Sequence, residues 1–334
     1  MRPSLLALIL FGAAPLVQPR VAAAQCTFSP PIGTLNDGGG FAWDIDGAGR
    51  VQNGTIDAFD IGMAVQIDGT YFPVSPTTLT GRELVVGPTA MAGLSITRKV
   101  YVSSTQSWAR WVDLYSNPTN ADITVDLLYE TNSGADSGRQ VVTTSSGDAV
   151  FSTGDAWLVT DDASDGGGDP TVAENLHDGR TFLQPDLVGN AVFDCAATNG
   201  TMWRYSSFTV PAGRTAALMT LVSQNPNRAS AASNAAALQA QDAGLEGLSP
   251  ADRGAIRNRL LPKTVLFVSD SATDAGIPAA LTADGHLVTT LTGQFQVATG
   301  ATTALVGPLS AYDAVIWSAT GQGSGSVNSD SAMY

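Results

Sequence analysis

The sequence of 334 residues is poor in lysine, cysteine and histidine, and it holds two of each. Its 16 lysines and arginines face 30 acidic residues, which gives a formal net charge of −14. Proteins bind nucleic acid and anionic lipid through clustered Lys and Arg, so this balance argues against both partners. It suits solubility outside the cell and the binding of divalent cations.

Long hydrophobic runs are also missing, because no apolar stretch reaches the roughly 20 residues that a membrane-spanning helix needs. Residues 1–24 combine Arg2, a short apolar run at 5–11 and three alanines at 22–24. A charged start, an apolar middle and a small-residue cleavage site are the pattern of a signal peptide. We therefore expect export to a secreted or cell-surface location, with no membrane insertion after the signal peptide is removed.

The two cysteines are Cys26 and Cys195. In an oxidising compartment an even pair favours one disulfide, and we predict this pair. The alternative is two unrelated thiols, either buried or free.

Glutamate is scarce as well, with 4 Glu against 26 Asp. Aspartate is disfavoured inside strands and helices and common in turns, which indicates a loop-rich β protein. Residues 93–102 and 123–129 alternate apolar and polar side chains, as half-buried strands do. We predict one large antiparallel β-sandwich over residues 27–225.

The composition changes near Pro226. Residues 228–243 are rich in alanine, a strong helix former. Ser249 and Pro250 form a helix start with Asp252 three residues after the serine, and this helix is expected to run to about Leu260. We therefore expect residues 226–261 to form a helical linker between two domains.

Residues 262–334 show a third pattern. The continuous apolar run at 264–269 reads as a strand buried on both faces. A helix-like piece and a strand at 287–291 follow, and residues 314–317 read as another buried strand. This order predicts a flavodoxin-like parallel sheet. Three strands with so little helix would leave one sheet face uncovered. We therefore expect an incomplete α/β domain and a chain that is a fragment; the alternative is that another copy of the chain covers the bare face.

The loop at 159–170 is the strongest candidate for chemistry. It carries four aspartates among glycines: Asp161, Asp162, Asp165 and Asp169. Calcium takes six to eight oxygen ligands, and clustered carboxylates supply them, so these residues are predicted to bind Ca²⁺. Two alternatives stay open: a solvated acidic turn, and the carboxylate pair of a glycosidase or lyase.

The aromatic and histidine side chains are weaker candidates for a functional site than this loop. Four tryptophans in strand-like segments could form either a sugar-stacking platform or, more economically, part of the core: Trp108, Trp111, Trp157 and Trp203. His177 and His286 are expected in turns or at the surface. The sequence has no G-x-S-x-G motif, and we predict no catalytic residue.

The segments VLFVSDS, ALTADGHLVTTL and LSAYDAVIWSATGQG resemble the opening of class I glutamine-amidotransferase-like α/β domains attached to exported bacterial proteins. This likeness covers about residues 263–325. Catalytic members of that family use a cysteine at a strand–helix elbow, and no cysteine follows Cys195, so the resemblance assigns no catalytic residue. The stretches RKVYVSSTQSWARWVDLYSNPTNADITV and VTDDASDGGGDP are similar to β-sandwich regions of large secreted bacterial proteins. That similarity implies an extracellular, multidomain context.

These observations predict an exported bacterial multidomain protein whose sandwich is a non-catalytic structural or ligand-binding module. Two alternatives are an accessory region of a secreted hydrolase or amidotransferase-like enzyme, and a carbohydrate-binding module. Calcium is the one cofactor expected. A glycan or another cell-surface component is the expected partner, and nucleic acid is not.

Overall fold

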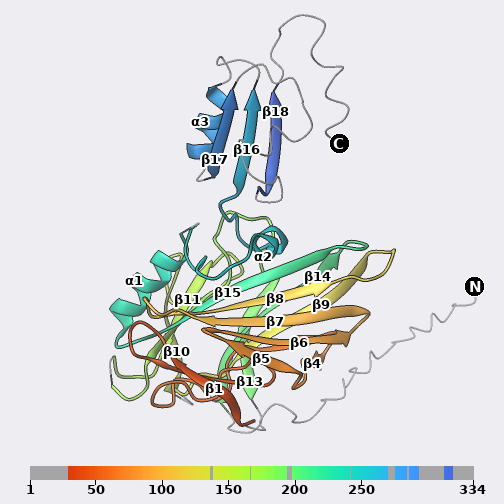
Figure 1. Cartoon of the computed structure of the whole chain (residues 1–334). Helices are drawn as coiled ribbons and strands as arrows, with labels where there is room; N and C mark the ends of the chain where they lie inside the picture. The colour runs from red at the N-terminus through yellow and green to blue at the C-terminus, as the bar shows by residue number, and fades with distance from the viewer. Residues whose placement is uncertain are drawn as a thin grey trace, which may run out of the picture.

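The computed structural model describes residues 29–135, 138–165, 167–193, 198–240, 242–269, 275–283, 286–292 and 312–318. In this part of the chain the protein is mostly β, with several antiparallel sheets and a few short helices (Figure 1). The predicted signal peptide, Cys26 and Cys195 lie outside the described residues, so export and the disulfide stay predictions.

The larger sheet has eight antiparallel strands. In spatial order they are β10 (Gln140–Thr144), β11 (Trp157–Asp161), β12 (Thr171–Asn175), β15 (Thr215–Asn225), β8 (Ala109–Ser116), β7 (Leu94–Val102), β6 (Glu83–Met91) and β5 (Thr77–Thr80). The predicted strand at 93–102 is thus confirmed as β7. Its inward positions are buried at every second residue, as the alternation required.

The second sheet has five antiparallel strands. In order they are β13 (Leu187–Phe193), β14 (Thr198–Val210), β9 (Ile123–Thr131), β3 (Ala64–Ile67) and β4 (Thr70–Tyr71). The predicted strand at 123–129 is confirmed as β9. A separate two-stranded ribbon pairs β1 (Pro31–Asn36) with β2 (Ala42–Asp46).

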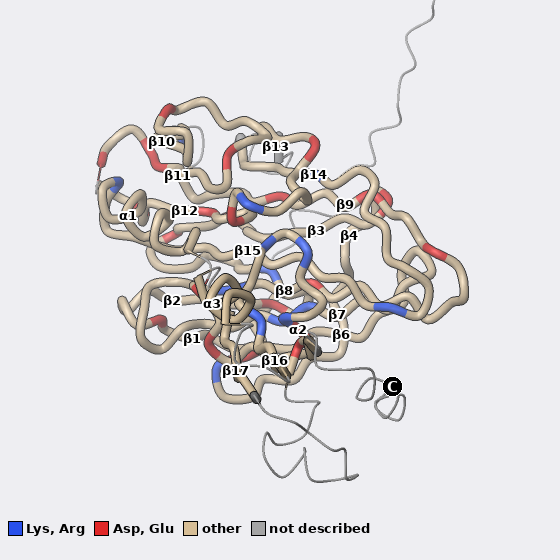
Figure 2. The backbone as a smooth tube through the Cα atoms, turned by 90° about the horizontal axis from the view of Figure 1, so that it is seen from above, with Lys and Arg blue, Asp and Glu red and all other residues tan. Residues whose placement is uncertain are grey.

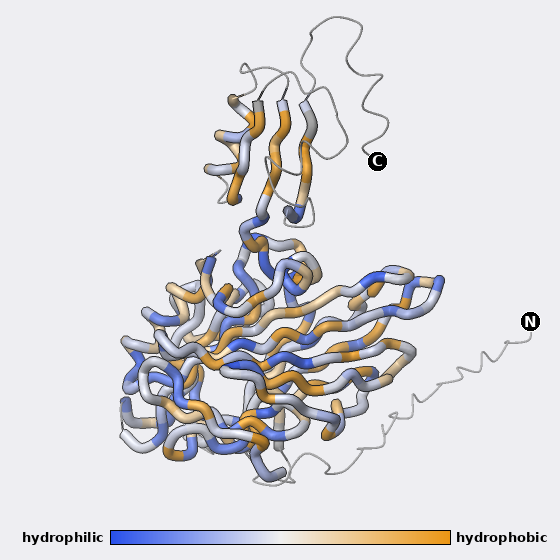
Figure 3. The backbone as a smooth tube through the Cα atoms, in the orientation of Figure 1, coloured by the Kyte–Doolittle hydropathy of each residue, from blue (hydrophilic) through white to orange (hydrophobic). Residues whose placement is uncertain are grey.

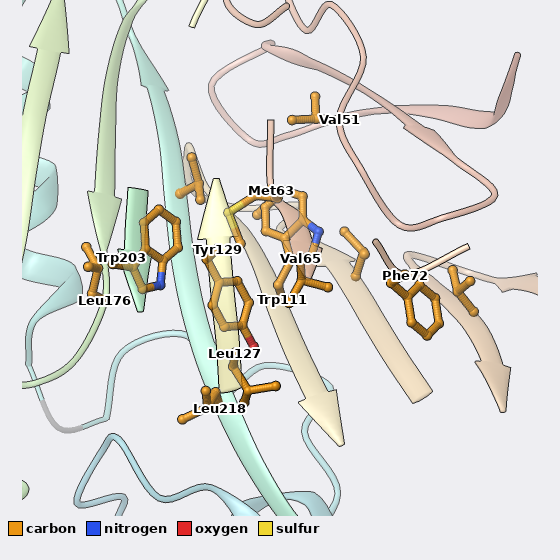
Figure 4. Packing of buried hydrophobic residues seen from close by; sticks show 14 of the residues in the cluster. Val51, Met63, Val65, Phe72, Trp111, Leu127, Tyr129, Leu176, Trp203 and Leu218 are labelled. Carbon is orange, nitrogen blue, oxygen red and sulfur yellow. The ribbon is translucent and has the colours of Figure 1, made fainter. Parts of the chain in front are cut away.

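Side chains from both sheets form one hydrophobic core (Figure 4). Trp111 of β8 is fully buried there, and Tyr129 of β9 stacks on Trp203 of β14 with ring centroids 5.5 Å apart. The Tyr129 hydroxyl lies 2.9 Å from the hydroxyl of Tyr115 on β8, so a buried hydrogen bond also joins the two sheets. The predicted antiparallel sandwich is therefore the main body of the molecule.

Two helices follow the sandwich strands, as expected, but both are shorter than predicted. The first, α1 (Arg228–Leu238), ends before residue 243. The second, α2 (Pro250–Ala255), begins at the predicted cap, since Ser249 Oγ accepts the Asp252 amide at 3.1 Å. It ends five residues early because Ile256 turns to an extended conformation and pairs with Ala217 of β15.

The segment 226–261 is a layer on the larger sheet, which differs from the linker we expected. Leu238, Leu248 and Leu261 pack with the side chains of strands β7, β8 and β15 that point away from the main core. Helix α1 places Ala231 and Ala235 against β11 and β12. The reason is physical: the outer face of this sheet carries large apolar side chains, and it must be covered from water.

A small parallel sheet follows, with the order β17 (Leu287–Thr292), β16 (Thr264–Ser269) and β18 (Ala314–Ser318). All three strands carry hydrophobic stretches (Figure 3), and α3 (Gly276–Ala283) contacts β17. The three predicted strands are confirmed. The predicted burial is found for β16 but is wrong for β18, where Val315 is 44% exposed because no described element covers that strand. An amidotransferase-like domain stays a prediction. Among the described helices, none is long and apolar enough to cross a bilayer.

Candidate functional site

The acidic loop predicted to bind calcium follows β11, and three of its aspartates contact Arg228, the first residue of α1. Arg228 donates from Nε to Asp161 Oδ2 at 2.7 Å and from Nη2 to the Asp162 carbonyl at 2.7 Å. Its backbone amide donates to Asp165 Oδ1 at 2.9 Å. Since Asp161 is buried, this ion pair ties the loop to the start of the helix. Asp169 stands further along, just before β12.

Within the described ranges, no three Asp, Glu, His or Cys side chains are grouped so that they could hold a metal ion. A calcium ion at this loop would share the Asp161 carboxylate with the guanidinium of Arg228. The calcium site stays a prediction that a calcium titration can test.

The four tryptophans weighed as a sugar platform are core residues. Their exposed fractions are small: Trp108 2%, Trp111 0%, Trp157 8% and Trp203 1%. Core packing, the more economical of the two interpretations, is therefore correct, and a glycan would have to bind elsewhere.

The expectation of a surface or turn histidine is wrong in one respect. His177 does sit in a turn, but its side chain is fully buried. Its Nδ1 accepts the Gly179 amide at 3.0 Å. Burial lowers the pKa of His177, and the nearby positive charge of Arg259 lowers it further. The neutral imidazole thus holds the turn together.

The structure reveals a site that the sequence reasoning missed, and we call it the cationic pocket. It is a hollow of about 910 Å³ where the loop after β12, the segment after α2 and the start of the parallel sheet meet. Among the described residues, its lining includes four basic side chains, one histidine and no acidic residue. These five are Arg180, Arg257, Arg259, Lys263 and His286.

The turn after β12 sets one wall of the pocket. Gly179 has φ +75°, a conformation that glycine adopts without strain. The buried Asp178 carboxylate accepts the amides of Arg180 (2.9 Å) and Thr181 (3.1 Å) through Oδ1. Its other oxygen accepts the Leu260 amide at 2.6 Å. Asp178 therefore fastens the two walls of the pocket to each other.

The opposite wall comes from the segment after α2. The Arg257 amide donates to the Ala217 carbonyl of β15 at 2.9 Å, which places that arginine beside β15. Arg259 donates from Nη1 to the Leu238 carbonyl at 2.9 Å. The Lys263 amide donates to His286 Nδ1 at 3.2 Å, so His286 is held beside the lysine.

In the described part of the chain, no carboxylate contacts the basic side chains of the pocket. None of the four Lys and Arg has an ion pair with a carboxylate of the described residues, whereas six cations elsewhere do. Asp178 and Asp313 act on Arg259 and Lys263 from a longer distance. Figure 2 shows several Lys and Arg near α2, while many Asp and Glu lie in the peripheral loops and some lie in the interior.

Two pKa shifts follow from this crowding. Burial lowers the pKa of Arg259 to about 10, although Asp178 and Tyr205 oppose the shift. Burial also lowers the pKa of Lys263, and the positive charges of Arg257 and Arg253 add to it, against the opposing charge of Asp313. Both shifts have the direction expected where the desolvation of a positive charge outweighs the attraction of a carboxylate that does not contact it.

One signal in the sequence pointed to this pocket. Four of the 16 basic residues fall within positions 253–263, in a chain where Lys and Arg are otherwise sparse. The contribution of Arg180 had no local signal, because it joins the others through the fold alone.

No family model matches the sequence, and no curated protein matches it. Among solved structures, the chain is similar to a polysaccharide lyase, at 7% identity and TM-score 0.36, over 52% of this chain and 27% of that one. It is similar to a mutant of the heparan sulfate lyase HepC from Pedobacter heparinus, at 12% identity and TM-score 0.31, over 51% and 24%. A Synechocystis protein is similar at 8% identity and TM-score 0.37, over 60% and 99%.

The chain thus spans about a quarter of the length of the two lyases, 27% and 24%. All three TM-scores are below 0.5. The interpretation of the cationic pocket rests on its own residues.

Proposed function

We propose that this chain is an exported, non-catalytic binding module that holds an anionic glycan in the cationic pocket. The observation that carries the proposal is the set of four basic side chains around one hollow, without an ion-pair partner among the described carboxylates, in a protein of net charge −14. Burial partly desolvates Arg259 and Lys263, which costs free energy, whereas Arg180 and Arg257 are exposed to solvent. An anionic ligand that supplies the counter-charge offsets that cost.

The predicted signal peptide supports a ligand found outside the cytoplasm, where carboxylated and sulfated polysaccharides are common polyanions. The two histidines support a non-catalytic role, since each uses its Nδ1 to accept a backbone amide and thereby fixes local structure. The same pocket would suit a free module or the accessory region of a larger secreted enzyme.

The proposal is tested by measuring the affinity of the purified chain for polygalacturonate and heparin, with neutral dextran as the comparison. Binding to the acidic polymers is expected to weaken as salt rises, because added ions screen the charges. Arg257→Gln is expected to lower the affinity about tenfold, the value of one charge-assisted hydrogen bond of roughly 1.5 kcal/mol.

The matched control is Arg214→Gln. Arg214 is exposed, makes no ion pair with any described residue and lines neither this pocket nor its neighbour, so its substitution removes the same charge elsewhere. If Arg214→Gln weakens binding as much as Arg257→Gln, the attraction is a general one and the pocket is not the site. Equal affinity for dextran and the acidic polymers would also contradict the proposal.

A further inference from the structure

The cationic pocket adjoins a second hollow, which we call the ring subsite. It has a volume of about 430 Å³ and shares four lining residues with the cationic pocket: Arg180, Thr181, Arg257 and Leu260. We infer that this hollow binds a sugar ring of an acidic oligosaccharide, stacked on Phe182, while the shared arginines hold the acidic group of the same ligand. The inference rests on the proposed function and names the part of the ligand that gives specificity.

Phe182 is the residue that points to a ligand. Its exposed fraction is 108%, and it is the one aromatic side chain among the large hydrophobic residues that stand exposed in the described chain. A fully solvated phenyl ring contributes no burial to folding, although burying a side chain of this size is worth roughly 1.5–3 kcal/mol. That free energy is available to a ligand that covers the ring.

The surroundings of Phe182 match a sugar ring better than an acyl chain. Leu183, Phe208 and Leu260 give the hollow an apolar floor, and Ser207 and Thr209 bring hydroxyl groups to its rim. Sugar rings have one apolar C–H face and many hydroxyls, so they meet both kinds of surface at once. Two of its apolar lining residues, Phe182 and Leu260, are exposed to solvent, so an acyl chain against them would stay partly in water.

The two hollows are held as one site before any ligand binds. Phe182 follows directly after Arg180 and Thr181, whose amides are bound to Asp178. The same carboxylate accepts the amide of Leu260, which lines both hollows. The backbone segments that carry Arg180, Phe182 and Leu260 are thus fixed relative to one another, and such pre-organisation of the backbone lowers the cost of binding.

The test compares three probes on the full chain: a short oligogalacturonate, its methyl ester, and inorganic sulfate. Phe182→Ala is expected to lower the affinity for the oligogalacturonate about tenfold and to leave sulfate binding unchanged. Phe182→Trp retains a stacking surface and is expected to retain the affinity. The methyl ester keeps the sugar rings but lacks the charge, so it is expected to bind more weakly than the oligogalacturonate.

Because Phe182 is fully exposed, both variants should have the melting temperature of the unmodified protein, and this is checked first. If Arg257→Gln weakens oligogalacturonate binding while Phe182→Ala does not, the proposed function stands and the ring subsite is refuted. If no acidic glycan binds, the proposed function itself fails. If Phe182→Ala lowers the affinity for oligogalacturonate and for sulfate equally, Phe182 does not stack on a sugar ring. The stacking role is also overturned if dodecyl phosphate, which carries an acyl chain, is the one ligand whose binding needs Phe182.

Discussion

The buried ion pair between Arg98 and Asp113 offers the sharpest test of how the sandwich is stabilised. The two residues are cross-strand partners on β7 and β8, and their exposed fractions are 0% and 2%. Arg98 Nε donates to Asp113 Oδ1 at 2.7 Å, and Nη1 donates to the Ala48 carbonyl at 3.1 Å. Burial by itself would lower the pKa of Arg98, but the charge of Asp113 raises it above its ordinary value.

Asp113→Ala leaves the arginine charge in the core without its partner. Removing one member of a buried pair typically costs about 3–5 kcal/mol, and in a body of this size one kcal/mol lowers the melting temperature by roughly 2–4 °C. We therefore expect the melting temperature to fall by the order of ten degrees in a calorimetric scan. The double variant Arg98→Met/Asp113→Leu is expected to recover most of the loss, because apolar residues of similar volume can replace such a pair.

A loss below about 1 kcal/mol in Asp113→Ala would refute this reasoning, since it would mean that water reaches the pair and screens it. If the double variant is as unstable as Asp113→Ala, lost packing and not the unpaired arginine charge causes the loss of stability. Tyr115→Phe serves as the comparison for a buried polar group nearby that carries no charge, and it should cost about 1 kcal/mol.

Three further outcomes are expected. Burial raises the pKa of Glu174 above its ordinary value of 4.5, so the protein loses stability as the pH rises and Glu174 ionises. Glu174→Gln should therefore raise the melting temperature at pH 7 and leave it unchanged at pH 4. Millimolar calcium should raise the melting temperature above its value in a chelator, and Asp165→Asn should abolish this shift. At a hundredfold excess of calcium over Kd, the stabilisation is about 2.7 kcal/mol. If no calcium concentration shifts the melting temperature, the loop does not bind calcium and its role is to hold Arg228. Because the pKa of Lys263 is lowered, the affinity for acidic glycans should begin to fall at a pH below the ordinary 10.5. Lys263→Gln should reduce that alkaline fall, and the rest is expected from Arg259, whose pKa is lowered to about 10.

The strands could be predicted because their signal is local. In β7 the alternation of Leu94, Ile96 and Val100 shows which face is buried, and β16 reads as one continuous apolar run. Period-two alternation also places Arg98 on the inward face. Nothing in the sequence identified its partner, since Asp113 reaches it only through strand pairing.

The position of the helical layer and of the cationic pocket could not be predicted in the same way. Helix α1 buries Ala231 and Ala235, and small alanines give no amphipathic pattern that separates a packed helix from a spacer. In the pocket, Arg180 and Arg257 are brought together from distant parts of the chain by the Asp178 contacts. These contacts form only when the sheet is assembled, so no local pattern in the sequence predicts them.

The place of β15 in the larger sheet has a consequence for how the molecule is assembled. β15 is the last sandwich strand along the chain, yet it lies between β12 and β8. Until it is in place, β5–β8 and β10–β12 are two separate half-sheets, each with an unpaired edge that can recruit other chains. Closing the sheet needs contacts across roughly a hundred residues, which makes it a slow, late step. The assembly of this sandwich is therefore exposed to aggregation until its central strand has arrived.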